Sequence, residues 1–180
     1  MHSSYEGMRE KKSNTDKLKA WETGFTGFPF VDACMRSLTY NGWITFRMRA
    51  MLTSFASYDL WIDWRESGYV LARLFTDYEP GIHYSKLNMQ SGVKCINTLR
   101  IYNPIKQSIE HDKEGEFIKK WVPELKNVPS MFIHEPWKMS LEEQTKYSCI
   151  LGKHYPLPIV DHKEAVRICL LYTSDAADDL

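Results

Sequence analysis

Residues Trp21 to Arg65 read WETGFTGFPFVDACMRSLTYNGWITFRMRAMLTSFASYDLWIDWR, a stretch that mixes aromatic residues with arginines and acids at helical spacing. This spacing predicts helices that pack into the protein interior. Arginine and aspartate are rarely buried unless a partner or a ligand compensates their charge. We therefore expect a helical body that encloses something polar.

Helical patterns continue beyond this stretch, and no segment alternates apolar and polar residues over the length of a strand. Pro29 suits the first turn of a helix and Gly42 its end. Further helices are expected over residues 44–60, 63–75 and 114–122, and a short one after a capping box of Ser140 and Glu143. Between residues 76 and 103 the periodicity fails, which predicts a long irregular loop that belongs to a functional site.

The chain has 180 residues, enough for one domain with a real core, and 43% of them are hydrophobic. Its 23 basic and 23 acidic residues cancel, so any DNA contact must come from a local basic patch. The four cysteines, Cys34, Cys95, Cys149 and Cys169, form no CxxC pair. That spacing argues against a metal site and favours isolated buried thiols.

The two ends of the chain differ from the middle. Residues 1–16 form a polar segment without the apolar core of a signal peptide, and no later run is apolar enough to cross a bilayer. We therefore expect a cytoplasmic protein with no membrane partner. The helical domain is expected over residues 17–168, and the last twelve residues, CLLYTSDAADDL, break its pattern and are expected to be a non-native tail.

Several ordered motifs along the chain resemble the flavin-binding domain of the DNA photolyase and cryptochrome family. The matching segments are WETGFTGFPFVDACMR and GWITFRMR in the opening stretch, DLWIDWR at its end, and RIYNPIKQ, DKEGEFIKKWVPELKNVP and HEPW further on. The resemblance covers residues 17–167. Matches of this length and order are far more specific than a single short motif.

The resemblance implies an all-α fold, the C-terminal part of the family's helical domain, and a chain that is a fragment of a longer protein. It also implies FAD as the cofactor, with contacts from Trp21, Arg49, Asp77, Tyr78 and Glu79. No antenna chromophore is assigned. An arginine beside a flavin ring stabilises negative charge on it, and a neighbouring carboxylate fixes the arginine. An ordinary salt bridge that orders the helices is the alternative for Arg49 and Asp77.

Two residues match positions that the family uses for electron transfer or flavin tuning. Trp64 matches the middle tryptophan of the family's electron relay, although core packing explains it equally well. His83 falls where photolyases place an asparagine that faces the flavin nitrogen N5, and a histidine there could donate a hydrogen bond or move a proton. A surface histidine in a loop is the alternative.

The same resemblance predicts where DNA would bind. Phe46, Arg47, Arg100 and Gln107 match positions near the lesion or the DNA backbone, with solvated surface polarity as the alternative for Arg100 and Gln107. Phe46, however, stands where the family has an asparagine. The chain also departs from the family at Ala50, which replaces a methionine, and at Leu87 and Met89, which replace tryptophans.

Two functions are therefore implied. The first is light-driven repair of pyrimidine dimers in UV-damaged DNA by a deoxyribodipyrimidine photolyase-like lyase. The second is a cryptochrome-like blue-light photoreceptor or regulator that binds FAD and a signalling protein without repairing DNA. The overall resemblance favours the first, whereas the departures at Phe46, Ala50 and the tryptophan-free segment 83–92 favour the second.

Overall fold

The computed structural model describes residues 15–93 and 101–178, and these residues fold into helices without any named strand. The helices in chain order are α1 (Thr15–Thr23), α2 (Pro29–Asn41), α3 (Phe46–Ser54), η2 (Phe55–Asp59), α4 (Trp64–Leu74), α5 (Pro80–Gln90), α6 (Pro104–His111), α7 (Glu116–Trp121), η3 (Pro123–Leu125), α8 (Ser130–Ile133), η4 (Pro136–Lys138), α9 (Leu141–Lys146) and α10 (His162–Asp178). The predicted all-α class is confirmed. None of these helices is long and apolar enough to cross a membrane.

Helix α2 is the central element, and its bounds agree with the prediction from sequence. Pro29 occupies the first turn, where its missing N–H costs no hydrogen bond. Gly42 ends the helix in the left-handed conformation at φ 70°, and its N–H donates to the Leu38 carbonyl. The helix packs against α1, α3, α6 and α7, so most of its residues are buried.

The predicted helix over residues 44–60 is divided in two. The α-helix α3 begins after Thr45, whose hydroxyl accepts from the Met48 N–H, and it ends at Ser54. Its continuation, η2, is a π-helix in which the Leu60 N–H donates to the Phe55 carbonyl, five residues back. All five residues of η2 are buried. The widened turn lies in the packed interior between α4 and α10.

The expectation of an irregular loop over residues 76–103 was wrong for residues 80–90, which form α5. Glu79 caps this helix, since its carboxylate accepts from the N–H groups of Gly81 and Ile82. Pro80, which was interpreted as a loop marker, stands in the first turn, where proline is favoured. The apolar periodicity of α5 is weak because one side of the helix faces a cavity with polar residues. Residues 94–100 lie outside the described part.

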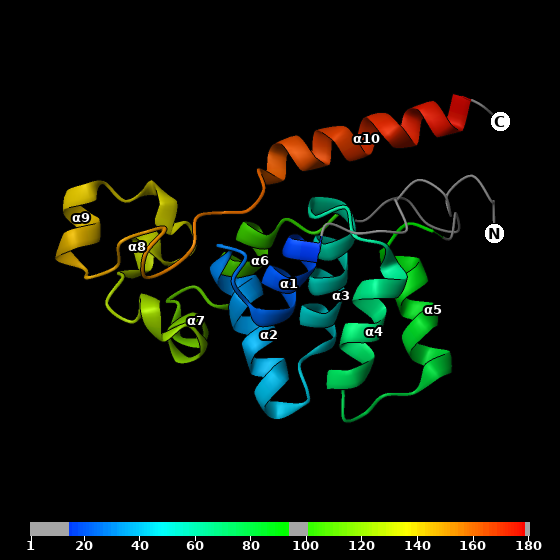
Figure 1. The fold of residues 1–180 in the computed structure, drawn as a ribbon, viewed down its shortest axis with the longest axis horizontal. Coiled ribbons are helices and arrows are strands. Elements are labelled where there is room, and N and C mark those ends of the chain that lie inside the picture. Colours follow the sequence, from blue (N-terminus) through cyan, green and yellow to red (C-terminus); the bar gives the residue numbers. More distant parts are fainter. Residues whose placement is uncertain (1–14, 94–100, 179–180) are drawn as a thin grey trace.

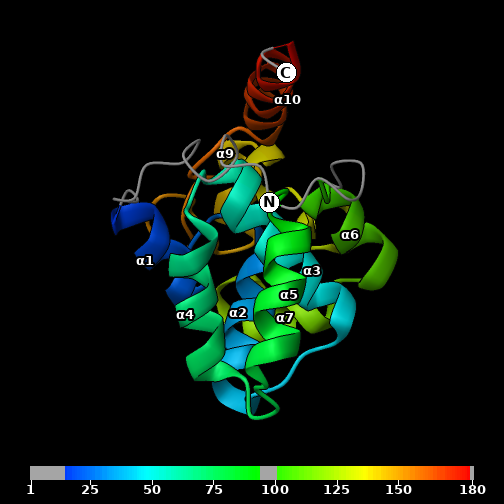
Figure 2. The same cartoon turned by 90° about the vertical axis from the view of Figure 1, so that its right-hand side faces the viewer.

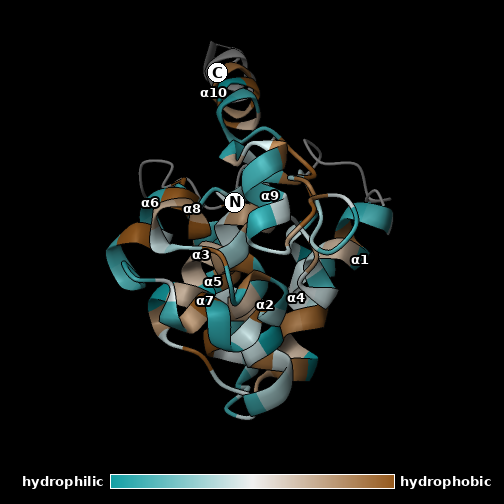
Figure 3. Cartoon of the chain, turned by 90° about the vertical axis from the view of Figure 1, so that its left-hand side faces the viewer, coloured by the Kyte–Doolittle hydropathy of each residue, from teal (hydrophilic) through white to brown (hydrophobic). Residues whose placement is uncertain are grey.

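The helices form two neighbouring groups, as Figure 1 shows: α2 to α5 stand side by side, and α7 to α9 form a smaller group beside α2. Helix α10 extends above the body in both side views (Figures 1 and 2). It is anchored at its start, where His162 contacts the buried carboxylate of Asp59 in η2. Hydrophilic residues run along α9, whose predicted capping box of Ser140 and Glu143 is confirmed (Figure 3).

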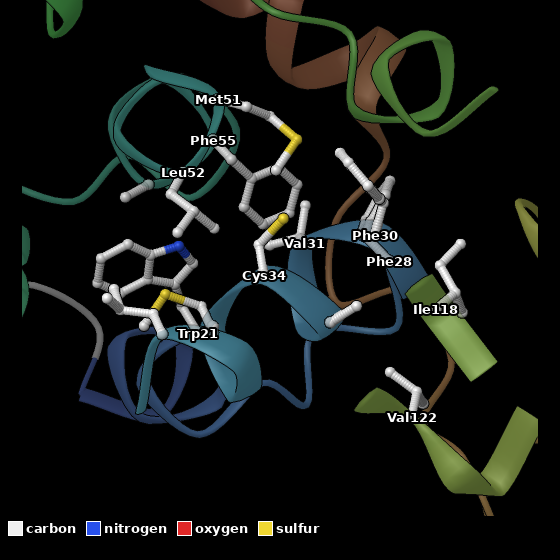
Figure 4. Close-up of a cluster of buried hydrophobic side chains, with 14 of the residues drawn as sticks. Trp21, Phe28, Phe30, Val31, Cys34, Met51, Leu52, Phe55, Ile118 and Val122 are labelled. Carbon is white, nitrogen blue, oxygen red and sulfur yellow. The ribbon is translucent and has the colours of Figure 1, made fainter. Parts of the chain in front are cut away.

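The hydrophobic core lies where α1, α2, α3 and η2 meet. Trp21 is fully buried there and lies near Cys34 and Leu52 in Figure 4. A smaller part of the same core reaches α7 through Ile118 and Val122. Cys34, Cys149 and Cys169 are buried cysteines, as predicted, and Cys95 lies outside the described residues.

A buried carboxylate joins the turn before α2 to the C-terminal part of the chain. Asp32 accepts from the Thr26 N–H at 2.8 Å, the Thr26 hydroxyl at 2.6 Å and the Gly27 N–H at 3.1 Å. The hydroxyl of Tyr155, 123 residues away, also donates to it. Two of the carboxylates enclosed by the helices thus find their partners within the protein. Asp32 accepts from Tyr155, and Asp59 contacts His162.

Candidate functional site

A cavity of about 210 Å³ lies between α3, α4, α5 and the segment that joins α4 to α5. It brings together six residues that were predicted to form the site although they are up to 37 positions apart in the sequence: Phe46, Arg49, Asp77, Tyr78, Glu79 and His83. Apolar side chains, among them Leu71, Phe75 and Leu87, form the rest of its wall. A slot with apolar walls and a few converging polar groups is typical of a small-molecule site.

Arg49 is the best-fixed charge in this cavity. Its Nη2 lies 2.9 Å from Oδ2 of Asp77, and its Nε donates to the Ile44 carbonyl at 3.0 Å. The guanidinium carbon also lies 4.1 Å from the centre of the Phe75 ring, the geometry of a cation–π contact. Three neighbours therefore hold the guanidinium at the cavity wall: Ile44 before α3, and Phe75 and Asp77 in the segment that joins α4 to α5.

The two carboxylates of the connecting segment have different tasks. The hydrogen bond from Arg49 lowers the pKa of Asp77 below its ordinary value of 3.8, so this carboxylate is ionised at neutral pH. Glu79 also lines the cavity, but both its oxygens already accept N–H groups at the start of α5. Asp77 therefore positions Arg49, whereas Glu79 positions α5 and with it the cavity face of that helix.

His83 stands on the first turn of α5 inside a group of aromatic rings. Its ring centre is 5.2 Å from Tyr78, 5.2 Å from Tyr84 and 6.0 Å from Phe75. Its Nε2 lies 3.0 Å from the carbonyl oxygen of Gly68 in α4. The histidine is thus built into the cavity wall, and the alternative of a surface loop residue is excluded by the helix beneath it.

Phe46 lies at the exposed rim of the cavity, with 54% of its surface accessible. Lys86 of α5 places its ammonium nitrogen 4.8 Å from the centre of the Phe46 ring. This contact joins α3 to α5 across the rim, and Lys86 adds a second cation to that of Arg49.

The other predicted site residues lie elsewhere. Trp21 is part of the core, because α1 packs on α2 and away from the cavity. Trp64 is half-buried and lies edge-on to Tyr84, with the ring centres 6.3 Å apart, but it does not line the cavity. Arg47 is exposed on α3 beside Phe46. Gln107 is 7% exposed and donates to Glu110, and Arg100 lies outside the described residues.

Three cavity residues on α5 were missed from the sequence, namely Ile82, Lys86 and Gln90, whereas Leu87 was named there as a departure from the family. With Glu79 and His83 they recur every three or four positions, which places them on one face of a helix. This pattern is visible in the sequence, but Pro80 and Gly81 near its start favour a loop. The single error about α5 therefore accounts for the omission of all three residues.

A larger cavity of about 480 Å³ lies where α6, η4 and α10 begin, and it contains none of the predicted site residues. His162 and Lys163 of α10, Asn103 before α6 and Trp137 of η4 line it. Charged side chains at this cavity already have partners within the protein, because Glu135 pairs with Lys138 at 2.6 Å and His162 pairs with Asp59. We therefore place the candidate site at the cavity beside Arg49.

The residues at this cavity fit the ring portion of a flavin. The apolar walls suit a planar ring, the fixed cation of Arg49 suits its electron-rich edge, and His83 offers a polar ring atom. A volume of about 210 Å³ holds a part of a dinucleotide, since whole ligand sites span roughly 300–1,000 Å³. No group of three or more His, Cys, Asp or Glu in the described residues could hold a metal ion.

Comparison with known proteins identifies the family of the chain. The family described as the FAD binding domain of DNA photolyase matches residues 1–174. A deoxyribodipyrimidine photo-lyase of Alkalihalophilus pseudofirmus is 44% identical over 171 residues, which cover 93% of this chain and 36% of that protein. The crystal structure of a class III photolyase from Agrobacterium tumefaciens superposes with a TM-score of 0.89 at 31% identity, over 98% of this chain and 37% of that one.

A cryptochrome of Synechocystis is similar in structure as well, with a TM-score of 0.87 and 32% identity over 92% of this chain and 34% of that chain. The chain spans about a third of the length of the curated relatives it matches. Both photolyases and cryptochromes therefore share its fold. The chain belongs to the family of the FAD binding domain of DNA photolyase, and FAD is its expected cofactor.

Proposed function

We propose that this protein acts in flavin-dependent, light-driven repair of pyrimidine dimers in DNA, as a deoxyribodipyrimidine photolyase-like lyase. The observation that carries the proposal is the meeting of Arg49, Asp77, Tyr78 and His83 around one cavity. The photo-lyase of Alkalihalophilus pseudofirmus, at 44% identity, supports the same function. UV-damaged DNA is the proposed partner and the cytoplasm the proposed location.

The residues of the cavity would hold the cofactor and shield it. Arg49, fixed by Asp77, would compensate negative charge on the ring, and Phe75 would bound one side of it. Leu71 and Leu87 would keep water from the ring, because both are buried at the cavity wall. When bound, FAD would supply the absorption of light and the electron for the cleavage of the dimer.

The exposed rim is the proposed approach for DNA. Phe46 is accessible there and offers a ring on which a base can stack, and Arg47 is exposed beside it on the same helix. Arg47 and Lys86 would contact phosphates, and the neutral net charge of the chain makes such a local patch necessary. Contacts from Arg100 and Gln107 remain predictions.

A cryptochrome-like photoreceptor or regulator, with a signalling protein as its partner, is the second candidate. It is favoured by the composition of the cavity, where Ala50 and Leu87 offer aliphatic surface in place of the methionine and the indole expected for a photolyase. Met89 is 43% exposed and does not line the cavity. Such a wall lacks the stacking platform for an extruded pyrimidine dimer.

One experiment separates the two candidates. The protein is reconstituted with FAD, mixed with UV-irradiated DNA that contains thymine dimers, and exposed to blue light. Both the loss of dimers and the photoreduction of the flavin are measured. Repair predicts loss of dimers in the light and none in the dark. Persistent dimers together with flavin photoreduction would favour the second candidate, and an Arg49→Met variant should lose both signals.

A further inference from the structure

The mouth of the cavity beside Arg49 lies where its wall residues reach solvent. Leu71 and Leu87 are buried and form the closed inner part of the wall. Phe46 at the start of α3 and Ile82 on α5 also line the cavity, but both side chains are exposed. The cavity therefore opens to solvent between α3 and α5.

One contact crosses this opening. The ammonium nitrogen of Lys86 on α5 lies 4.8 Å from the centre of the Phe46 ring on α3, and both residues line the cavity at exposed positions. The two helices also pack against each other elsewhere, so this contact is not what holds them together. An exposed cation–π contact is weak. It can therefore break and form again while the helices stay in place.

The two cations of the cavity differ in how firmly they are held. Arg49 is fixed by Asp77 and by the Ile44 carbonyl. Lys86 has no hydrogen bond and no ion pair within 4.0 Å in the described part of the chain. The pKa of Asp77 is lowered chiefly by the hydrogen bond from Arg49, and Lys86 contributes only as a nearby charge. With its flexible four-carbon stem, Lys86 is the cation that is free to move.

A phosphate group is a stronger partner for this ammonium than a phenyl ring. A phosphate carries a full negative charge and accepts charge-assisted hydrogen bonds, whereas the ring offers only its quadrupole. The net charge of the chain is zero, so a nucleic acid is attracted only by local cations, such as Lys86 and the exposed Arg47 on α3. A strand that reaches the rim therefore competes with Phe46 for Lys86.

We propose that Phe46 and Lys86 form a strap across the mouth of the cavity, and that a nucleic-acid phosphate opens the strap by drawing Lys86 away from the Phe46 ring. This inference rests on the proposed function, since it takes the ligand to be a flavin and the anion to be the DNA backbone. It adds a coupling between the rim and the cavity. Contact with DNA speeds the exchange of the ligand and frees the Phe46 ring for stacking with a base.

The first arm of the test measures the association and dissociation rate constants of FAD with the full chain by stopped-flow flavin fluorescence. A strap raises the barrier to entry and to exit alike. Phe46→Leu, which removes the ring and keeps an apolar side chain, should therefore increase both rate constants by about twofold to fivefold and leave their ratio within about twofold. An increase in the dissociation rate constant alone would indicate an ordinary wall contact and would overturn the inference.

Variants of the lysine test whether the same contact is responsible. Lys86→Met removes the charge and should increase the dissociation rate constant by the same factor as Phe46→Leu, and the double variant should show no further increase. Lys86→Arg keeps a cation over the ring and should keep the wild-type value. The matched control is Lys146→Met, because Lys146 lies 5.4 Å from the Tyr147 ring on the far side of α9 from any cavity residue in sequence and does not line the cavity. It should leave both rate constants unchanged.

The second arm adds an undamaged single-stranded oligodeoxyadenylate at low ionic strength. It should increase the FAD dissociation rate constant of the wild type by about twofold to fivefold and leave that of Phe46→Leu unchanged, since no strap is left to open. A peptide nucleic acid of the same sequence, whose backbone is uncharged, should have no effect on the wild type. An oligonucleotide that slows dissociation or leaves it unchanged in the wild type would overturn the coupling.

A third arm needs no flavin. The ε-methylene protons of Lys86 should show an upfield ring-current shift in proton spectra, which Phe46→Leu abolishes and the oligodeoxyadenylate reduces. Absence of the shift in the wild type would overturn the inference. If FAD binds with the same rate constants in wild type and Phe46→Leu, the inference fails and the proposed function stands. If FAD does not bind to the chain, the proposed function fails and the inference fails with it.

Discussion

Asp77 is a residue whose two effects can be measured separately. Its side chain is 49% exposed, and ion pairs at such sites contribute about 1 kcal/mol or less to stability. Its effect on Arg49, however, fixes the cation that faces the ligand. Asp77→Asn should therefore weaken FAD binding by about tenfold and change the free energy of unfolding by less than about 1 kcal/mol.

Urea denaturation and FAD titration of the same sample check this prediction. Because the pKa of Asp77 is lowered, its contribution to stability is present above pH 3.8 and is lost only as the pH falls through the lower, folded-state value. FAD binding should accordingly show no transition from Asp77 between pH 5 and pH 8. A loss of several kcal/mol in Asp77→Asn would contradict the assignment of Asp77 to the site.

Tyr155 is the residue that closes the buried network around Asp32. A hydrogen bond to a charged group contributes about 1.5–3 kcal/mol, so Tyr155→Phe should lower the free energy of unfolding by about 2 kcal/mol at pH 8. Tyr40→Phe, at a side chain that is 81% exposed, is the matched control and should change it by less than about 0.5 kcal/mol.

The pH dependence gives this prediction a sign. Burial raises the pKa of Asp32 although its hydrogen bonds oppose the shift, so stability from this group is present below pH 3.8 and is lost as the pH rises through the folded-state value. Tyr155 limits that loss by bonding the charged form. The cost of Tyr155→Phe should therefore be larger at pH 8 than at pH 4, and an equal cost at both would show that Tyr155 does not act on the carboxylate.

At the scale of elements, the turn before α2 meets the segment after Tyr155 through a glycine. Gly27 has φ 80°, and a Cβ there would lie 2.4 Å from the Leu157 carbonyl oxygen. Gly152 has the same φ of 80°, but a Cβ there would meet nothing within 4 Å. Substitutions at Gly27 and Gly152 therefore separate the cost of backbone strain, which both share, from the cost of a steric clash, which only Gly27 has.

Gly27→Ala should lower the free energy of unfolding by about 3 kcal/mol or more, since strain and overpacking add. Gly152→Ala should lower it by about 1–2 kcal/mol, the cost of the left-handed conformation alone. Thermal and urea unfolding of both variants provide the comparison. Equal losses in the two variants would mean that the contact of Gly27 with Leu157 does not hold the two segments together.

For the whole molecule, the proposed cofactor links the helices around the cavity, because α3, α4 and α5 all contribute to its wall. A ligand that binds only the folded state stabilises it by mass action, by about 2.7 kcal/mol at a hundredfold excess over its dissociation constant. FAD should therefore raise the unfolding temperature of the chain. Arg49→Met should lose most of this increase in the unfolding temperature. AMP, which lacks the flavin ring, should give no increase.

The sequence was sufficient for the helices whose ends and buried faces have local causes. Pro29 and Gly42 bound α2, whose apolar residues recur at helical spacing, and the capping box of Ser140 and Glu143 starts α9. It was misleading for α5, because Pro80 and Gly81 indicate a loop unless the Glu79 cap is recognised. The same error concealed Ile82, Lys86 and Gln90 on the cavity face of that helix.

The sequence alone determined the all-α class and the family, because motifs and periodicity are properties of neighbouring positions along the chain, and the family resemblance implied the pairing of Arg49 with Asp77 that the structure contains. Only the tertiary structure decided that Trp21 belongs to the core and that the His83 ring of α5 lies 3.0 Å from the Gly68 carbonyl oxygen of α4. The physical reason is that burial and the choice of hydrogen-bond partner depend on how helices pack, and the close contact of α4 and α5 at Gly68 is not encoded by either segment alone.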